Sequence, residues 1–302
     1  MTVTRRIFPH LVSLFIFVMP VLATPKWPLP EGVKSVEVNS YEMAYQEMGS
    51  GAPLVLVHGA INDYRVWAAQ LPEFAKNYRV IAVSLRHYYP ERWDGKGSDF
   101  SIEQHISDVP VFIRQLNLGP VHLLGHSRGG AVVLNAAKMH SELIKSLILE
   151  DASGLEALLP ESPDNAKLVA EAKANREALA HALAAGETES GIQRFIESLN
   201  GAGSWSKLAA DRKQIYFDNI RTALIPEGRP VTTCAEISKL NFPILLLNGE
   251  RSPKRYGAMY QAMRKCKDIP EPVVIPMPLT PCTETIQRRS MPPFSVSLRA
   301  NK

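Results

Sequence analysis

Short apolar runs recur along this chain, separated by segments whose apolar residues have helical spacing. The runs occupy residues 53–60, 78–85, 121–125, 144–151, 242–253 and 272–276. They do not alternate between apolar and polar side chains, which is typical of strands buried on both faces. The helical segments occupy residues 64–77, 101–117, 128–140 and 256–266. Because strands that alternate with helices form parallel sheets covered on both sides, the sequence predicts an α/β fold with a mostly parallel sheet flanked by helices.

Two regions interrupt this alternation. Residues 33–51 alternate apolar and polar side chains around a turn at Asn39 and Ser40, which predicts a β-hairpin. Residues 153–232 are rich in Ala, Glu and Lys and contain no strand-like run, which predicts a helical cap inserted into the core. The sequence therefore predicts a core formed by residues 24–152 and 233–276.

The N-terminal residues are typical of an export signal. Arg5 and Arg6 precede an apolar run at 11–22, and a small residue, Ala23, ends a plausible cleavage site. The run is shorter than the roughly 20 apolar residues that span a bilayer. We therefore expect residues 1–23 to be a signal peptide and the mature protein to be periplasmic or secreted, without a stable membrane span. An uncleaved anchor and an ordinary apolar N-terminus are the alternatives.

Cysteine content and charge limit the other possibilities. Of the three cysteines, Cys234 and Cys266 flank one predicted strand–helix unit and form the candidate disulfide, although two buried free thiols fit the sequence equally well. No C-x-x-C or His-rich spacing predicts a metal site. The net charge is +4 with no block of basic residues, which argues against a nucleic-acid surface. The sequence gives no indication of oligomeric state.

The segment Gly125-His126-Ser127-Arg128-Gly129 has the pattern G-x-S-x-G and lies between a predicted strand and a predicted helix. In that context the serine stands on a sharp, strained turn at the carboxyl end of the sheet. The helix N-terminus favours negative charge there, and the amide of Arg128 can donate to an oxyanion. The second donor should come from the loop after the first buried strand, and the Ala60 amide is the candidate. His58 in that loop is interpreted as structural.

These residues, with His58-Gly59 and the strand–helix order of residues 35–276, resemble the α/β-hydrolase superfamily. The resemblance implies a Ser–acid–His triad in chain order, hydrolysis through an acyl-enzyme and no cofactor. It also implies an acid after the strand that ends at Glu250 or after the one that ends at Glu150 and Asp151. We favour Glu250, with Glu150 or Asp151 as the alternative, although many relatives carry an aspartate where Ser252 stands.

The resemblance also implies a histidine after the last strand, beyond Pro276. The histidines of this chain are His10, His58, His87, His105, His122, His126, His140 and His181, so none occupies that position. A substitute base among His126, His87 and His181 is the less favoured explanation. Residues 277–302 lack helical spacing, and a shifted reading frame of this segment permits the expected histidine and final helix. We therefore interpret 277–302 as an aberrant, disordered tail from a frameshift, with a genuine divergent tail as the alternative.

The sequence thus predicts an exported serine hydrolase, a carboxylesterase that acts on a small ester through Ser127 and is impaired by the absent histidine. Apolar residues of the cap, among them Phe195 and Tyr216, would form a pocket wall or simply the core of the cap. The main alternative is a catalytically inactive small-molecule-binding relative. Cofactor-free peroxidation or carbon–carbon cleavage at the same serine stays open.

Overall fold

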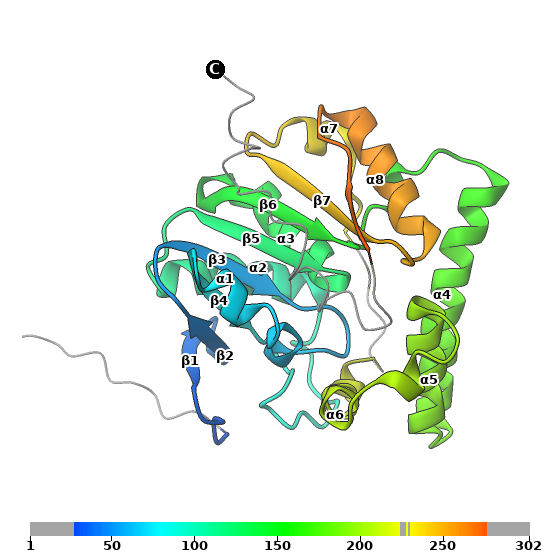
Figure 1. Cartoon of the computed structure of the whole chain (residues 1–302), viewed down its shortest axis with the longest axis horizontal. Coiled ribbons are helices and arrows are strands. Elements are labelled where there is room, and N and C mark those ends of the chain that lie inside the picture. Colours follow the sequence, from blue (N-terminus) through cyan, green and yellow to red (C-terminus); the bar gives the residue numbers. More distant parts are fainter. Residues whose placement is uncertain (1–26, 224–227, 229, 277–302) are drawn as a thin grey trace, which may run out of the picture.

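The computed structural model describes residues 27–223, 228 and 230–276 (Figure 1). The predicted signal peptide at 1–23 and the tail at 277–302 lie outside the described residues. The helices of the described part include none that is long and apolar enough to cross a membrane.

An eight-stranded sheet forms the centre of the molecule, in the order β1-β2-β4-β3-β5-β6-β7-β8. Its strands are β1 Val33–Val38, β2 Tyr41–Met48, β3 Ala52–Val57, β4 Tyr78–Val83, β5 Val121–His126, β6 Ile144–Glu150, β7 Ile244–Gly249 and β8 Val273–Ile275. β2 runs antiparallel to β1 and β4, and all other pairs are parallel. The predicted mostly parallel sheet is therefore confirmed.

The predicted hairpin is β1 and β2. Val38 pairs with Tyr41 across a two-residue turn, and both turn residues, Asn39 and Ser40, have positive φ (49° and 60°). Such a turn matches the twist of the strands on either side, which favours the hairpin over other connections.

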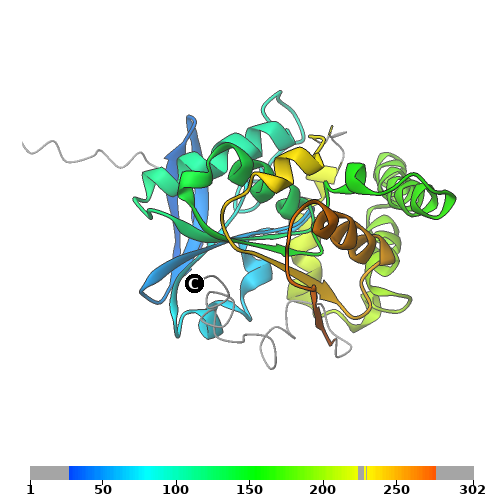
Figure 2. The same ribbon diagram turned by 90° about the horizontal axis from the view of Figure 1, so that it is seen from above.

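Helices cover the sheet unevenly (Figure 2). One face packs against α2 Ile102–Gln115, α3 Arg128–Met139, α7 Cys234–Ser238 and α8 Lys254–Cys266. The other face packs against η1 Tyr64–Trp67 and α1 Leu71–Phe74. Successive residues of one strand serve both faces, because side chains alternate along a strand: Val55 and Val57 face α2 and α3, whereas Leu54 and Leu56 face α1.

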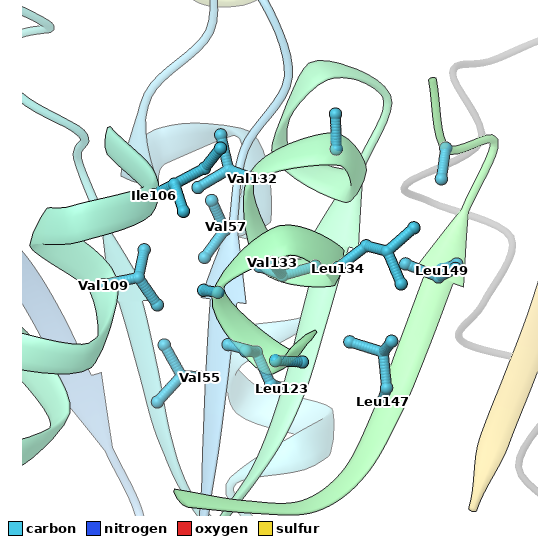
Figure 3. Packing of buried hydrophobic residues seen from close by; sticks show 14 of the residues in the cluster. Val55, Val57, Ile106, Val109, Leu123, Val132, Val133, Leu134, Leu147 and Leu149 are labelled. Carbon is cyan, nitrogen blue, oxygen red and sulfur yellow. The ribbon is translucent and has the colours of Figure 1, made fainter. Parts of the chain in front are cut away.

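The core beneath α3 is made of branched aliphatic side chains (Figure 3). Those that the figure labels are Val55, Val57, Leu123, Leu147 and Leu149 from the strands, Ile106 and Val109 from α2, and Val132, Val133 and Leu134 from α3. Continuous burial on this side fixes α3, and with it the turn that joins α3 to β5.

The helix predicted at 64–77 is wrong as a single element. The structure has two short helices, η1 and α1, in its place. Pro72 has no amide hydrogen to donate to a preceding turn, so it cannot lie inside a continuous helix, but it fits the first turn of a new one. The helix predicted at 101–117 is α2; it begins as expected at Ser101, whose hydroxyl accepts from the Gln104 amide at 3.0 Å.

The segment between β6 and β7 is helical where the structure describes it. Its helices are η3 Glu156–Leu158, α4 Pro163–Ala184, α5 Thr188–Asn200, η4 Trp205–Lys207, α6 Ala210–Asn219 and η5 Ile220–Ala223. Between α3 and β6 lies the short η2 Ser141–Leu143. α4, α5 and α6 group together to one side of the sheet (Figure 1) and share an apolar cluster that includes Leu179, Ile196 and Trp205. Ile61, from the loop after β3, joins this cluster and connects the cap to the core.

A disulfide joins Cys234 and Cys266, the candidate pair, with their Cα atoms 4.9 Å apart. It links α7 to α8 on the face of the sheet that also packs against α2 and α3. Cys282 lies outside the described residues.

Candidate active site

Ser127 stands between β5 and α3 in a backbone conformation that side chains rarely adopt, with φ 50° and ψ −116°. Such strain costs on the order of 1–3 kcal/mol and persists only where the surroundings hold it. Here the Ser127 amide donates to the Glu150 carbonyl at 2.9 Å, and the Ser127 carbonyl accepts from the amides of Gly130 and Ser153 at 2.9 and 3.0 Å. The turn is therefore fixed by the neighbouring strand β6 as well as by its own helix.

The flanking glycines explain the sequence pattern. A Cβ on Gly125 would stand 2.5 Å from the Gly129 carbonyl oxygen and would also collide with a methyl of Val133. A Cβ on Gly129 would stand 2.6 Å from the Val57 carbonyl oxygen and still closer to that of His58. These contacts are too close for any side chain, so strand, turn and helix can approach one another only with glycine at these two positions.

A cavity lies in front of Ser127, between the sheet and the cap. The core contributes Ala60, Ile61, Asn62, His126, Ser127, Asp151, Ser252, Pro253 and Tyr256, and the cap contributes Phe195, Ile196, Leu199, Asn200, Arg212 and Tyr216. Several of the cap residues are apolar, and Phe195 and Tyr216 belong both to this cavity wall and to the apolar cluster of the cap. The cap therefore forms one wall of the cavity that the serine faces.

The two candidate oxyanion donors come from the loop after β3 and from the start of α3. Ala60 lines the cavity, and Arg128 is the first residue of α3, directly after Ser127. The Arg128 side chain is buried, with Nη2 2.8 Å from Nδ1 of His105 and the guanidinium 5.5 Å from the centre of the Phe100 ring. The Arg128 side chain is thus engaged with His105 and Phe100, and the role of the Arg128 amide as an oxyanion donor stays a prediction.

The three candidate acids have different environments. The Glu250 side chain is exposed and does not line the cavity. Glu150 is buried, and neither carboxyl oxygen has a hydrogen-bond partner among the described residues. Burial, with the nearby Asp151 charge, raises the pKa of Glu150 to about 8. Of the three, only Asp151 lines the cavity with Ser127.

Asp151 is held by polar neighbours from β7 and the loop after it. Its Oδ2 accepts from the Ser252 hydroxyl at 2.5 Å, and its Oδ1 accepts from the Asn248 amide at 2.9 Å. Burial raises the pKa of Asp151, whereas these two hydrogen bonds act in the opposite direction. The carboxylate that follows β6 is therefore positioned by β7 and the loop after it.

Two histidines lie near the serine, and both are buried. His58 accepts from the Leu85 amide through Nε2 at 3.0 Å, so its Nδ1 carries the hydrogen and donates to the Gly59 carbonyl at 2.8 Å. This confirms its structural interpretation. His126 lines the cavity, and burial together with the Arg212 charge lowers its pKa to about 4. Both rings are thus neutral at physiological pH.

The remaining histidines in the described residues lie elsewhere. His87 bonds Glu91 and Asp99, at 3.0 and 2.9 Å. His181 is exposed on α4. The others, His105, His122 and His140, do not line the cavity.

Tyr256 was not singled out from the sequence. It begins the buried side of α8 and lines the cavity together with Ser127, and its hydroxyl accepts from Arg255 at 2.7 Å. Burial raises the pKa of Tyr256, so the phenol stays protonated. Only the position of α8 at the cavity brings Tyr256 near Ser127. In the sequence, a tyrosine in a helical pattern is indistinguishable from a core residue.

Among the described residues, no group of three His, Cys, Asp or Glu side chains is arranged to hold a metal ion.

Comparison with known proteins agrees with the geometry. The model of the alpha/beta hydrolase fold family matches residues 52–254. A 2-hydroxy-6-oxo-6-(2'-aminophenyl)hexa-2,4-dienoic acid hydrolase of Metapseudomonas resinovorans is 31% identical over 40% of this chain and only 42% of its own length. An (E)-2-((N-methylformamido)methylene)succinate hydrolase of Acinetobacter baylyi is 27% identical over 75% of this chain and 82% of its own.

Solved structures share the fold at low sequence identity. A thermophilic esterase from Thermogutta terrifontis has a TM-score of 0.60 and 20% identity, covering 88% of this chain and 96% of its own. Naproxen esterase from Bacillus subtilis has a TM-score of 0.58 and 18% identity, and the match covers 90% of this chain and 91% of the esterase.

Proposed function

This chain belongs to the α/β-hydrolase fold family, and on that premise we propose that it is a serine hydrolase whose nucleophile is Ser127 and whose substrate is a small carboxylic ester. The observation that carries the proposal is the strained turn at Ser127, which faces a cavity shared with Asp151. A backbone held at that cost at the mouth of a cavity is typical of a reactive group. Esterase activity in structural relatives and the small acids named in two sequence relatives support a small organic substrate.

The proposed reaction is acyl transfer. The Ser127 hydroxyl releases its proton to solvent as its oxygen attacks the ester carbonyl, and the amides of Ala60 and Arg128 hold the resulting oxyanion. Solvent returns a proton to the departing alkoxide in the next step. Collapse of this intermediate expels the alcohol and leaves an acyl-enzyme, which water then hydrolyses.

We assign the acid of this site to Asp151 in place of Glu250. Asp151 lies in the cavity and bonds to Ser252, the position at which many family members carry the aspartate. A carboxylate from β6 thus takes up the region that the residue after β7 occupies in those relatives.

Turnover should be low, because no described residue beside Ser127 is a good base. His126 has a pKa of about 4 and is a weak base, and Tyr256, whose pKa burial raises, already holds its proton at neutral pH. Loss of a triad base costs on the order of 10⁴ to 10⁶ in rate, while oxyanion-hole and binding effects remain.

The direct test is labelling of the protein by a fluorophosphonate together with hydrolysis of p-nitrophenyl acetate. We expect slow labelling and slow turnover, both abolished by Ser127→Ala and unchanged by Ser206→Ala, which removes an exposed hydroxyl from the cap. Labelling that survives Ser127→Ala would refute the assignment of the nucleophile.

The poor bases beside Ser127 favour a second candidate, an inactive protein that binds small molecules in the same cavity. It predicts no labelling and no turnover, with retained ligand binding. The two candidates therefore differ in the first measurement.

We also propose that the protein is exported. The Cys234–Cys266 disulfide supports this location, because disulfides persist in oxidising compartments. Expression of the full chain in a bacterium, followed by fractionation and N-terminal sequencing, tests it. We expect a periplasmic product cleaved after Ala23, and an intact cytoplasmic chain would contradict the proposal.

A further inference from the structure

Arg212 of α6 extends into the cavity in front of Ser127. Its Nε and Nη1 are buried and have no hydrogen-bond partner among the described residues. A guanidinium cannot give up its charge in a protein, and leaving buried donors unpaired is costly. The cavity therefore contains an unsatisfied cation facing the space that a ligand would fill.

Contacts with the core fix the helix that carries Arg212. The Asn219 amide donates to Oδ2 of Asp63 at 2.6 Å, and Arg65 bridges Asp63 and Asp218 at 2.7 and 2.8 Å. These bonds tie the C-terminal end of α6 to the loop after β3. Within the helix, the Arg212 guanidinium lies 4.8 Å from the centre of the Tyr216 ring, one turn away. The helix is thus fixed to the core, and the guanidinium lies over the ring of Tyr216, which also lines the cavity.

The acid in the cavity does not neutralise this cation. Asp151 is bound by Ser252 and Asn248, and the described part of the chain contains no ion pair between Asp151 and Arg212. By contrast, the neighbouring cation Arg65 has two carboxylate partners. Arg212 also contributes to the lowered pKa of His126, so its charge is felt at the residue next to Ser127.

We propose that Arg212 binds a carboxylate of the substrate, so that this cavity selects esters that carry a carboxylate, such as half-esters of short dicarboxylic acids. A guanidinium presents paired N–H donors that match a carboxylate, and charge-assisted hydrogen bonds of this kind are the strong ones. The anion would satisfy the two buried donors while the apolar cap side chains enclose the carbon chain. The assignment of this anion to a substrate depends on the proposed function.

Binding can be measured apart from catalysis. Isothermal titration calorimetry on the Ser127→Ala protein would compare monomethyl glutarate, which is anionic, with dimethyl glutarate, its neutral diester. We expect the anion to bind at least about tenfold more tightly, because one charge-assisted hydrogen bond contributes enough for that difference.

Arg212→Gln, also in the Ser127→Ala background, should remove the preference, and Arg212→Lys should keep part of it. The matched control is Lys207→Ala, which removes one positive charge from an exposed residue of the cap and should leave the preference unchanged. Thermal melts of all variants identify any that fail to fold. If Arg212→Gln does not fold, the reduced preference expected of Arg212→Lys assigns the effect to residue 212, and equal binding of the two esters by the Ser127→Ala protein still overturns the proposal.

The outcomes separate the two proposals. An Arg212-dependent preference for the anion supports the carboxylate site, whether or not the unmutated protein hydrolyses esters. Equal binding of the two esters, or a preference that survives Arg212→Gln, overturns it. Absent labelling and turnover in the unmutated protein would refute only the proposed hydrolase activity.

Discussion

Ser127 and Asp151 follow neighbouring strands, β5 and β6, and both have a positive φ, 50° and 42°. Ser127 lies between glycines at 125 and 129 that the close packing of strand and helix requires. Asp151 lies between Glu150 and Ala152, and its conformation is held by distant residues: its amide donates to the Leu247 carbonyl at 3.0 Å, and its carboxylate binds Ser252. The Ser127 turn carries a local sequence signature in its two glycines, although β6 also holds its backbone. The Asp151 turn has no such signature and depends on the pairing of β6 with β7.

The largest effect should come from filling the space beside the serine. Gly129→Ala puts a Cβ against the His58 carbonyl oxygen and 2.6 Å from that of Val57, and neither backbone segment can move without breaking the sheet. We expect a loss of about 4 kcal/mol or more in the free energy of unfolding, or no folded protein. Denaturant unfolding measures it.

Gly257→Ala is the control for that substitution. Gly257 lies in α8, and a Cβ added there would have nothing within 4 Å, so alanine should stabilise the helix by roughly 0.5–1 kcal/mol. An equal loss at both positions would show that packing at the turn is not the cause.

Glu150, next to Asp151, should make stability depend on pH. Its pKa is about 8 in the folded protein against 4.5 in the unfolded chain, so the folded state holds a proton that the unfolded state releases. Stability is therefore highest below pH 4.5 and is lost as pH rises through about 8. By pH 9 the loss should be on the order of 4 kcal/mol.

The measurement is the free energy of unfolding of Glu150→Gln beside the unmutated protein at pH 5 and pH 9. Because glutamine does not ionise, the free energy of unfolding of the variant should exceed that of the unmutated protein only at pH 9. Parallel pH profiles would contradict the buried carboxyl. Glu250→Gln, at an exposed position, serves as the control.

Removing the disulfide tests how far the part of the cavity around Asp151 and Tyr256 depends on the link between α7 and α8. Replacing Cys234 and Cys266 together by serine opens a loop with a sequence separation of 32 residues and should cost about 3 kcal/mol. Denaturant unfolding with and without reductant measures this. Because the bond holds α7 to α8, we expect the cavity around Tyr256 to loosen. Reductant should destabilise the unmutated protein and leave the variant unchanged; no effect of reductant on the unmutated protein would contradict the role of the bond.

The smallest effect expected is a partial restoration of the missing base. Tyr256→His places an imidazole near both Ser127 and Asp151, and we expect roughly tenfold faster turnover of p-nitrophenyl acetate, because general-base catalysis contributes at least that much when geometry is imperfect. The rate should rise as pH increases through the ordinary imidazole range. Tyr256→Phe is the control and should give no gain.

The Tyr256→His variant can also be used to compare Asp151 with Glu250 as the acid of the site. Asp151→Asn should remove the gain of Tyr256→His, and Glu250→Gln should leave it intact. The reverse result would restore Glu250 as the acid and would show that its exposed side chain turns into the cavity.

Much of this arrangement was predictable from local pattern. The buried strands, the hairpin and the turn at Ser127 each show a sequence pattern within a few neighbouring residues. The favoured acid was not predictable in the same way, because Glu250 and Asp151 both follow apolar strands and differ only in where they point. Tyr256 and Arg212 carried no signal, since their roles arise from what α8 and α6 pack against.

The sequence by itself determined the alternation of buried strands with helices and the tight turn at Ser127, because side-chain size and backbone freedom act over a few residues. Only the tertiary structure decided that Asp151 shares the cavity with Ser127 and that Arg212 faces them without a hydrogen-bond partner for its buried Nε and Nη1 among the described residues. Those placements depend on strand register and on how the cap docks, which bring together residues that are far apart in the chain.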